Sequence, residues 1–305
     1  TDGGASISSQ VDEVFTVEQC LYAIMVASAN DIALQIAEHV GGSVDGFVQQ
    51  MNTRAQELGC TNTVFTNPTG LPDENQHTTA HDMALITKAA IDNESFRAIA
   101  ETTSYTIPAT NVSGGERVLT NNFSMLNNTN ASYYQYCLGG REGYTEASGS
   151  TLVCGAEKNG VSLIAVILQG ASGTTAAEAV SLLNYGFDNF QLLSLGDNDF
   201  DMASGGNVFV PNGTTADALT TQDGEVQDGQ YNRQFLFNGT PVGTAVMSVT
   251  SPEEDTAVIE ASTQNLTNAQ DYTVSHTSVP YFVIGGIGLL LLLLILFRIV
   301  KVAKS

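Results

Sequence analysis

Apolar side chains recur every three or four positions through the first hundred residues, which is the spacing of amphipathic helices. Capping residues and glycines divide this part of the chain into five segments. We therefore predict helices over residues 16–27, 31–41, 43–58, 79–92 and 94–100. Asp31 is the expected N-cap of the second helix, and Gly41-Gly42 is expected to end it.

Beyond Thr102 the alternation shortens to every second residue, first in the run SYTIP and then over residues 134–170. The second run predicts three strands joined by turns at residues 147–149 and 158–160. A helix is expected at about residues 175–189. Helices, an antiparallel sheet and a further helix predict an α/β (α+β) sandwich.

The chain changes character again after residue 190. The short β-like runs NVFV, QFLFNG, GTAVMSVT and TAVIEA are separated by Gly, Asn and Asp, as in a small all-β domain. We expect a first domain over residues 1–190, a small β-domain over residues 191–262 and a polar stalk over residues 263–278.

Residues 279–297 form an uncharged apolar run long enough for a transmembrane helix. Three basic residues follow in the tail 298–305, namely Arg298, Lys301 and Lys304. Positive charge marks the cytoplasmic side, so we expect a single-pass protein of the cell membrane with residues 1–278 outside. The alternative is a buried helix of a soluble protein.

Charge narrows the possible partners. The 305 residues hold 10 Lys and Arg against 32 Asp and Glu, a net charge of −22. Nucleic-acid binding needs clustered basic side chains, so we predict no nucleic-acid partner. The chain also holds eight Asn-x-Ser/Thr sequons, and whether they are glycosylated stays open.

Four cysteines, Cys20, Cys60, Cys137 and Cys154, are too few for a disulfide scaffold and form no Cys-x-x-Cys pair. Cys137 and Cys154 could face each other across a hairpin, but the sequence leaves their pairing open.

Two short motifs are weak when each is taken alone. Ser28-Ala29-Asn30 lies between two predicted helices, where Ser and Asn commonly act as a C-cap and an N-cap. Arg141-Glu142-Gly143 lies on a predicted strand, and exposed hairpins commonly carry opposite charges.

Their order along the chain is more specific. ASAND, NPTGL, HTTAHD and GGREGYTEASGSTLV follow one another over about residues 10–190. In this the sequence resembles the serine D-alanyl-D-alanine carboxypeptidases, the low-molecular-mass penicillin-binding proteins. The resemblance implies a penicillin-binding, β-lactamase-like fold with a second β-domain and a C-terminal anchor. It also implies hydrolysis of peptidoglycan stem peptides ending in D-Ala-D-Ala, inhibition by β-lactams, and no cofactor.

The resemblance also assigns roles to residues. The family has a Ser-x-x-Lys nucleophile motif, a Ser-x-Asn loop and a Lys-Thr-Gly strand. Ser28 matches the loop serine that relays a proton, and Asn30 matches the residue that orients the lysine or the substrate. Arg141, Glu142, Gly143 and Thr145 lie where the substrate-binding strand is expected.

Two departures from the family pattern stand out. No Ser-x-x-Lys precedes Ser28, and the chain starts at Thr1 without a signal sequence. We therefore expect the sequence to be a fragment that cannot form an acyl-enzyme by itself.

The second departure is Glu142 in place of a hydroxyl. Two carboxylates ~4 Å apart at an effective dielectric of ~20 repel by about 4 kcal/mol, which corresponds to roughly three decades of rate. Activity therefore requires Glu142 to turn away, to pair with Arg141 or to be protonated. A divergent substrate site is our first interpretation, and damage by substitution is the second.

Other interpretations remain to be weighed. His77 and His81 could bind zinc if both lay on one helix, and Asp197, Asp199 and Asp201 imitate the start of a calcium loop. A catalytically inactive relative that binds the cell wall or a membrane protein is the alternative function. A surface adhesion or scaffold module is the third.

Overall fold

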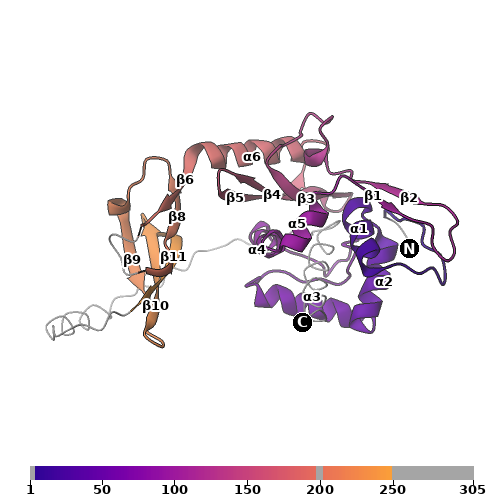
Figure 1. Ribbon diagram of the computed structural model, residues 1–305, viewed down its shortest axis with the longest axis horizontal. Helices are drawn as coiled ribbons and strands as arrows, with labels where there is room; N and C mark the ends of the chain where they lie inside the picture. The colour runs from indigo at the N-terminus through magenta and orange to yellow at the C-terminus, as the bar shows by residue number, and fades with distance from the viewer. Residues whose placement is uncertain (1–3, 197–201, 249–305) are drawn as a thin grey trace. The chain divides into compact units, whose positions relative to one another are not determined.

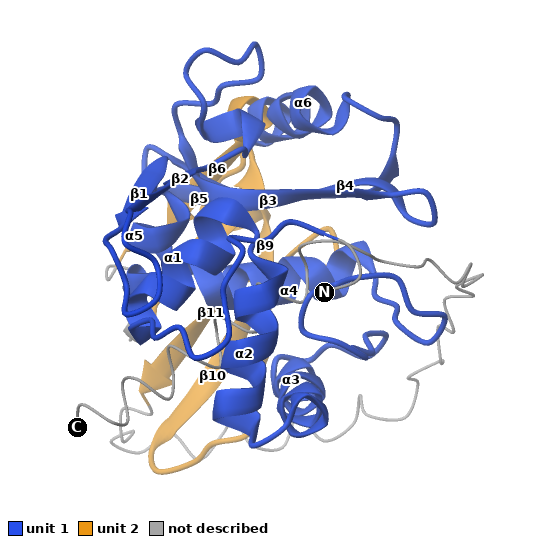
Figure 2. Cartoon of the chain, turned by 90° about the vertical axis from the view of Figure 1, so that its right-hand side faces the viewer, with its two compact units in different colours: residues 1–186, 280–305 blue, residues 187–279 orange. Residues whose placement is uncertain are grey.

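The computed structural model describes residues 4–196 and 202–248. These residues divide into two compact units, one ending at Gly186 and the other starting at Phe187. Figure 1 labels their helices and strands, and Figure 2 colours the two units separately.

Six α-helices form where helical periodicity predicts them. They are α1 (Val17–Ala27), α2 (Asn30–Gly41), α3 (Val44–Glu57), α4 (Ala80–Ile91), α5 (Glu94–Ala100) and α6 (Thr175–Asn189). Side-chain caps fix several starts, since Thr16, Ser43, Thr79 and Asn93 each accept a backbone N–H of the first turn.

The expected cap of α2 is wrong. The N-cap residue is Ala29, which makes no side-chain capping bond. The Asp31 carboxylate instead accepts the Ser9 N–H and the Ser9 hydroxyl, each at 2.9 Å, and the Ile7 N–H at 3.3 Å. Burial alone would raise the pKa of Asp31, but these hydrogen bonds outweigh it and lower the pKa below its ordinary value. The residue therefore holds the N-terminal segment against α2.

The central sheet of unit 1 contains β3 (Cys137–Thr145), β4 (Gly149–Lys158) and β5 (Val161–Gly170) in the antiparallel order β3-β4-β5. Both predicted turns are confirmed. Figures 1 and 2 show α6 on one face of this sheet and α1, α4 and α5 on the other. The middle strand is buried from Ser150 to Ala156, as expected for a strand with neighbours on both edges. The mixed α/β class predicted from the sequence is confirmed.

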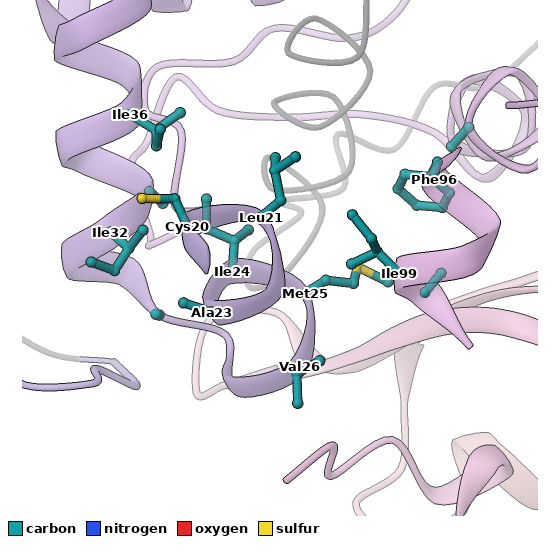
Figure 3. Packing of buried hydrophobic residues seen from close by; sticks show 14 of the residues in the cluster. Cys20, Leu21, Ala23, Ile24, Met25, Val26, Ile32, Ile36, Phe96 and Ile99 are labelled. Atoms are coloured by element: carbon teal, nitrogen blue, oxygen red, sulfur yellow. The ribbon is translucent and has the colours of Figure 1, made fainter. Parts of the chain in front are cut away.

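Helix α1 lies at the centre of the hydrophobic core. Its side chains pack between Ile32 and Ile36 of α2 on one side and Phe96 and Ile99 of α5 on the other (Figure 3). Ile24 is fully buried, and Met25 is 1 % exposed. This helix ends at Ser28, so the core fixes the position of the Ser28-Ala29-Asn30 turn.

A two-stranded hairpin, β1 (Ser104–Ile107) and β2 (Arg117–Thr120), lies beside α1, and the short 3-10 helix η1 (Ser124–Leu126) follows it. The sequence did not predict β2, because a strand of four residues is too short to show a period. Arg117 donates from both guanidinium ends to Glu13, at 2.8 and 3.0 Å. This bidentate pair ties the segment before α1 to the hairpin.

All four cysteines are buried free thiols. Cys137 lies opposite Ala156 and Cys154 opposite Gly140, so the two cysteines are not directly paired across the hairpin. Burial raises the pKa of both Cys20 and Cys137 to about 11.

From Phe190 on, the described part of unit 2 contains strands and one short 3-10 helix, η2 (Ala216–Ala218). Its sheets have the orders β7-β11-β10-β9 and β6-β8. The strands are β6 (Phe190–Ser194), β7 (Met202–Gly205), β8 (Asn207–Pro211), β9 (Leu219–Asp223), β10 (Gln230–Phe237) and β11 (Thr240–Ser248). The runs NVFV, QFLFNG and GTAVMSVT correspond to β8, β10 and β11, whereas β6, β7 and β9 were not predicted.

Several sequence predictions fall outside the described residues. They are the run TAVIEA, the stalk 263–278, the apolar span 279–297, the tail 298–305 and the calcium-like Asp197, Asp199 and Asp201. Over the residues that are described, no helix has the length and apolar character needed to cross a bilayer.

Candidate functional site

Ser28 occupies the turn between α1 and α2 in a left-handed conformation, with φ 56° and ψ 33°. It is the C-cap of α1, and its N–H donates to the Ala23 carbonyl. Positive φ is uncommon for a residue other than glycine, so the fold fixes an unusual backbone here. The C-cap interpretation of Ser28 is therefore confirmed as far as its backbone is concerned.

Asn30 is the first residue of α2 and is 7 % exposed. Its N–H donates to the Ala5 carbonyl at 2.8 Å. A Cβ atom at Gly4 would lie 2.0 Å from the Asn30 amide nitrogen, and φ there is 96°, so the close approach favours glycine. The N-terminal segment thus covers Asn30, and the interpretation of Asn30 as an N-cap is wrong because Ala29 holds that position.

The glycines before Arg141 allow β3 to approach its neighbours. Gly139 has φ 105°, and a Cβ there would lie 2.6 Å from the Ala100 Cβ of α5. A Cβ at Gly140 would lie 2.2 Å from the Val153 carbonyl oxygen on β4. Close packing against α5 and β4 therefore explains the two glycines.

Arg141 is a buried side chain, only 8 % exposed. Its Nη1 donates to the Met25 carbonyl at 2.6 Å, in the last turn of α1, where the helix has no basic residue of its own. Burial lowers the pKa of Arg141 to about 10, and the charge of Glu142 opposes this shift. The interpretation of Arg141-Glu142 as an exposed hairpin charge pair is wrong, because Arg141 is inside.

Glu142 contacts a different element from Arg141. The Ser124 hydroxyl donates to Glu142 Oε2 at 3.0 Å, from η1. Successive strand residues face opposite sides of a sheet, which explains why Arg141 reaches α1 while Glu142 reaches η1. Arg141 Nε and Glu142 Oε1 are both buried and have no hydrogen-bond partner within the described part of the chain.

An open cavity of about 370 Å³ brings these elements together. It is lined by Ser28, Asn122, Phe123, Arg141, Glu142, Gly143, Tyr144, Ser150, Thr151, Ser172, Gly173 and Thr175. Many lining groups are hydroxyls, which can donate to and accept from a polar ligand. The cavity therefore unites Ser28 with Arg141, Glu142 and Gly143, which lie more than one hundred positions later in the chain.

Two residues of the predicted site do not line this cavity. Asn30 lies beneath the N-terminal segment, as described above. The Thr145 hydroxyl accepts the Ser148 N–H at 3.1 Å and lies 2.9 Å from the Ser148 hydroxyl, so it holds the turn between β3 and β4.

Sequence reasoning missed several lining residues, including Asn122, Thr151 and Ser172. Thr151 had a usable signal, since the predicted turn at 147–149 places it opposite Gly143 on the neighbouring strand. Asn122 and Ser172 lie in loops without any periodic pattern, so only the fold brings them to the cavity.

The proposed zinc pair does not form a helical i, i+4 arrangement. His77 precedes α4 and forms a backbone bridge with Val64, whereas His81 lies in the first turn of the helix. The helical premise for zinc is therefore wrong. The described residues contain no cluster of three or more His, Cys, Asp or Glu side chains suited to a metal.

Comparison with known proteins places this geometry in a family. The DacF D-alanyl-D-alanine carboxypeptidase of Bacillus subtilis is 33 % identical over 193 residues, covering 62 % of this chain and 47 % of the relative. The DacB2 D-alanyl-D-alanine carboxypeptidase of Mycobacterium tuberculosis is 33 % identical over 179 residues, covering 57 % and 58 %. The chain thus spans about half the length of these curated relatives.

Solved structures show the same fold. Penicillin binding protein 5 from Haemophilus influenzae superposes with a TM-score of 0.64 at 22 % identity, over 81 % of this chain and 78 % of that one. A D-alanyl-D-alanine carboxypeptidase from Mycobacterium tuberculosis gives a TM-score of 0.52 at 30 % identity, over 60 % and 70 %. The model of the D-alanyl-D-alanine carboxypeptidase family, peptidase S11, matches residues 1–172. More than half of the chain fits this model, and the chain belongs to the D-alanyl-D-alanine carboxypeptidase family.

Proposed function

We propose that unit 1 supplies the proton-relay and carboxylate-binding part of a serine-type D-Ala-D-Ala carboxypeptidase. Its substrates are peptidoglycan stem peptides, from which it removes the terminal D-alanine through an acyl-enzyme. One observation carries the proposal, namely that Ser28 and Arg141 line the same cavity although they are far apart in sequence.

Each residue has a role that its position supports. Arg141 attracts the C-terminal carboxylate of the peptide, and its planar guanidinium can bind both carboxylate oxygens. Ser28 passes a proton towards the leaving amine. Gly143 leaves the edge of β3 open for the peptide backbone, whereas Asn30 and Thr145 hold the two turns that border the cavity.

Carboxylate binding must compete with the Met25 carbonyl, which already accepts from Arg141 Nη1. The unpartnered Nε is a second donor of the same guanidinium, directed away from Nη1. A small shift of the side chain towards the cavity lets Arg141 keep one partner and gain the other. Glu142 does not oppose this step strongly, because its carboxylate faces Ser124.

The chemistry also needs a nucleophile. These 305 residues contain no Ser-x-x-Lys. The proposal therefore requires a Ser-x-x-Lys element placed beside Ser28 and Arg141, and it is tested on the full-length gene product.

The test is acylation by a fluorescent penicillin, together with release of D-alanine from a D-Ala-D-Ala peptide. Ser28→Ala and Arg141→Ala should lower both rates at least 100-fold, whereas Arg54→Ala, which changes an exposed Arg–Glu pair, should leave them unchanged. A folded full-length protein that is inert to peptide and penicillin would contradict the proposal.

A catalytically inactive, peptide-binding relative is the second candidate. The existing hydrogen bond between Arg141 and the Met25 carbonyl favours this candidate, because the guanidinium expected to bind substrate already has a structural partner. This candidate predicts that a D-Ala-D-Ala peptide binds and is recovered uncut, with binding lost in Arg141→Ala. Equilibrium dialysis with mass analysis of the peptide distinguishes it from the enzyme.

We also propose that residues 279–297 anchor the protein in the cell membrane with residues 1–278 outside. The apolar run and the basic residues that follow it support this orientation. Protease added to intact cells should digest the N-terminal part and spare an epitope placed after Ser305. Digestion of the epitope alone would show that the protein has the opposite orientation.

A further inference from the structure

The cavity that holds Ser28 and Arg141 continues around the edge of β3. Arg141 and Glu142 are neighbours on this strand, so their side chains leave it on opposite faces. Both nevertheless line the cavity. Among its lining residues in the described chain, Arg141 is the one base and Glu142 the one acid. The lining therefore has no net charge.

A peptide that ends in D-alanine brings one negative charge, its terminal carboxylate, into this cavity. That carboxylate balances Arg141 and leaves Glu142 without a counter-charge. A charge held away from water is costly unless an opposite charge or several hydrogen bonds offset the loss of hydration. A terminal residue with a positive side chain as well as its carboxylate restores neutrality. The charge balance therefore favours a basic terminal residue.

The Glu142 carboxylate has one oxygen engaged and one available. The Ser124 hydroxyl donates to Oε2 at 3.0 Å and so holds the carboxylate in place. Oε1 is buried and accepts no hydrogen bond from residues 4–196 or 202–248. A buried acceptor without a donor costs free energy, and an ammonium group can donate up to three hydrogen bonds. A ligand ammonium can therefore supply the donor that Oε1 lacks.

Other lining groups suit an alkylammonium side chain. Tyr144 is 62 % exposed at the cavity, and the face of an aromatic ring attracts cations. The hydroxyls of Ser150 and Thr175 can accept further hydrogen bonds from an ammonium. Phe123 offers apolar surface to the methylene groups that precede the charge. The cavity thus combines an acid, hydroxyls, an exposed aromatic ring and an apolar wall.

The two faces of β3 set the length of the side chain that fits. The terminal carboxylate lies at Arg141 on one face, and the ammonium must reach Glu142 on the other. The methyl group of alanine does not cover this separation. A linear aminoalkyl side chain, as in lysine or ornithine, extends around the strand edge. Gly143, which also lines the cavity, presents no side chain to block this path.

We propose that Glu142 selects peptides whose terminal D-residue carries a side-chain ammonium, such as D-lysine, and that the protein releases this residue faster than D-alanine. Arg141 holds the terminal carboxylate, and Glu142 holds the ammonium. Water cleaves the same peptide bond, giving its hydroxyl to the new carboxylate and a proton to the released amine. This cleavage rests on the carboxypeptidase function proposed above, whereas recognition of the basic residue can be measured without it.

The experiment compares peptides that differ only in the residue after the penultimate D-alanine, namely D-alanine, D-norleucine or D-lysine. Norleucine resembles the apolar stem of lysine and lacks the ammonium, so it separates charge from length. The full-length protein in detergent should release D-lysine with a kcat/KM at least about 10-fold above that for D-norleucine, the size expected for one hydrogen bond to a charged group. The difference should lie mainly in KM, because Glu142 binds the ground state and the transition state alike.

Two glutamate variants separate the local site from the overall charge. Glu142→Gln should reduce the preference for lysine over norleucine to less than about 2-fold, because the hydrogen bond to a charged group is lost. Glu146→Gln removes the same charge from the exposed turn after β3 and should keep the wild-type preference. This control is needed because a chain with a net charge of −22 attracts any cationic peptide from a distance. Circular dichroism and thermal unfolding establish that both variants are folded.

Equal rates for the lysine and norleucine peptides in the wild type would overturn this selectivity. So would a Glu142→Gln variant that loses the same factor on both peptides, because the carboxylate would then serve the reaction itself, for example by pairing with a catalytic lysine. Failure of the proposed function looks different, since the wild type would then release no terminal residue from any peptide. Isothermal titration calorimetry with the uncut peptides then makes the same comparison, and equal affinities for the lysine and norleucine peptides would overturn the selectivity.

Discussion

Arg141 on β3 donates a 2.6 Å hydrogen bond to the Met25 carbonyl in the last turn of α1. The carbonyls at a helix C-terminus lack partners within the helix and carry partial negative charge. A guanidinium from the sheet satisfies one of them three residues before Ser28. The same side chain therefore supports the α1–α2 turn and borders the candidate substrate cavity.

The first prediction follows from this bond. Arg141→Ala should lower the free energy of unfolding by about 2–3 kcal/mol, because a buried hydrogen bond to a charged group is lost. Arg54→Ala, which removes an exposed pair with Glu57, should cost less than about 1 kcal/mol. Urea unfolding monitored by circular dichroism measures both. Equal losses would mean that the Arg141 bond contributes nothing beyond an ordinary surface pair.

The second prediction concerns the backbone of Ser28. Because φ is 56° there, glycine should suit the turn better than any residue with a Cβ. Ser28→Gly should therefore be more stable than Ser28→Ala by about 1 kcal/mol. Thermal unfolding of the two variants gives this difference directly, and a more stable alanine variant would contradict it. Both variants lack the hydroxyl, so both should lose the proposed proton relay.

The third prediction tests whether Ser124 holds Glu142 away from Arg141. A double-mutant cycle with Ser124→Ala and Glu142→Gln should give a coupling energy of about 1–2 kcal/mol. The exposed pair of Ser162 and Glu157, 3.2 Å apart, serves as the control. Its cycle should give less than about 0.5 kcal/mol. Absence of coupling in the first cycle would show that the Ser124 bond does not fix the carboxylate.

The fourth prediction concerns the approach of β3 to α5. Gly139→Ala adds a methyl group 2.6 Å from the Ala100 Cβ and strains a backbone with φ 105°. We expect a loss of about 2–4 kcal/mol from overpacking and strain together. Gly114→Ala, where no atom lies within 4 Å of the added Cβ, should change stability by less than about 1 kcal/mol. Denaturant midpoints compare the two, and similar values would mean that the sheet and helix can separate freely.

The fifth prediction concerns acid. Hydrogen bonds lower the pKa of Asp31 in the folded state below its ordinary value of 3.8. The unfolded chain then binds the proton more readily, so Asp31 stabilises the fold above pH 3.8, and this contribution is lost as pH falls through the lower, folded pKa. Between about pH 5 and 3, the free energy of unfolding should therefore fall less in Asp31→Asn than in the wild type, because the variant lacks this titrating group. Urea midpoints across that range measure it. Asp228→Asn, in an exposed turn of unit 2, should leave the profile unchanged.

Long periodic segments could be predicted from the sequence because their pattern repeats within each element. The helices α1–α6 and the strands β3–β5 are of this kind. Among the strands of four or five residues, β1 and β8 were predicted, whereas β2 and β6 were missed because their few positions show no clear period. Their formation depends on partners elsewhere in the chain, for example β8 in the case of β6.

The candidate site was predictable only in part. The motif order brought Ser28 and Arg141 together, and strand alternation allowed Glu142 to face away. Burial of Arg141 could not be foreseen, because its partner is a backbone carbonyl more than one hundred residues earlier. The prediction that Asp31 caps α2 was wrong for a related reason. A carboxylate beside a helix start normally caps it, but here residues 7 and 9 offer three competing donors.

The pair of Glu13 and Arg117 also bears on the order of events during synthesis. The two residues are 104 positions apart, and the segment they hold leads directly into α1. Closing so long a loop is slow, because its entropy is lost before any contact compensates for it. On the ribosome, Glu13 emerges long before its partner has been translated. The entry to α1 therefore reaches its final position only after the β1–β2 hairpin has left the exit tunnel, however early the helix itself forms.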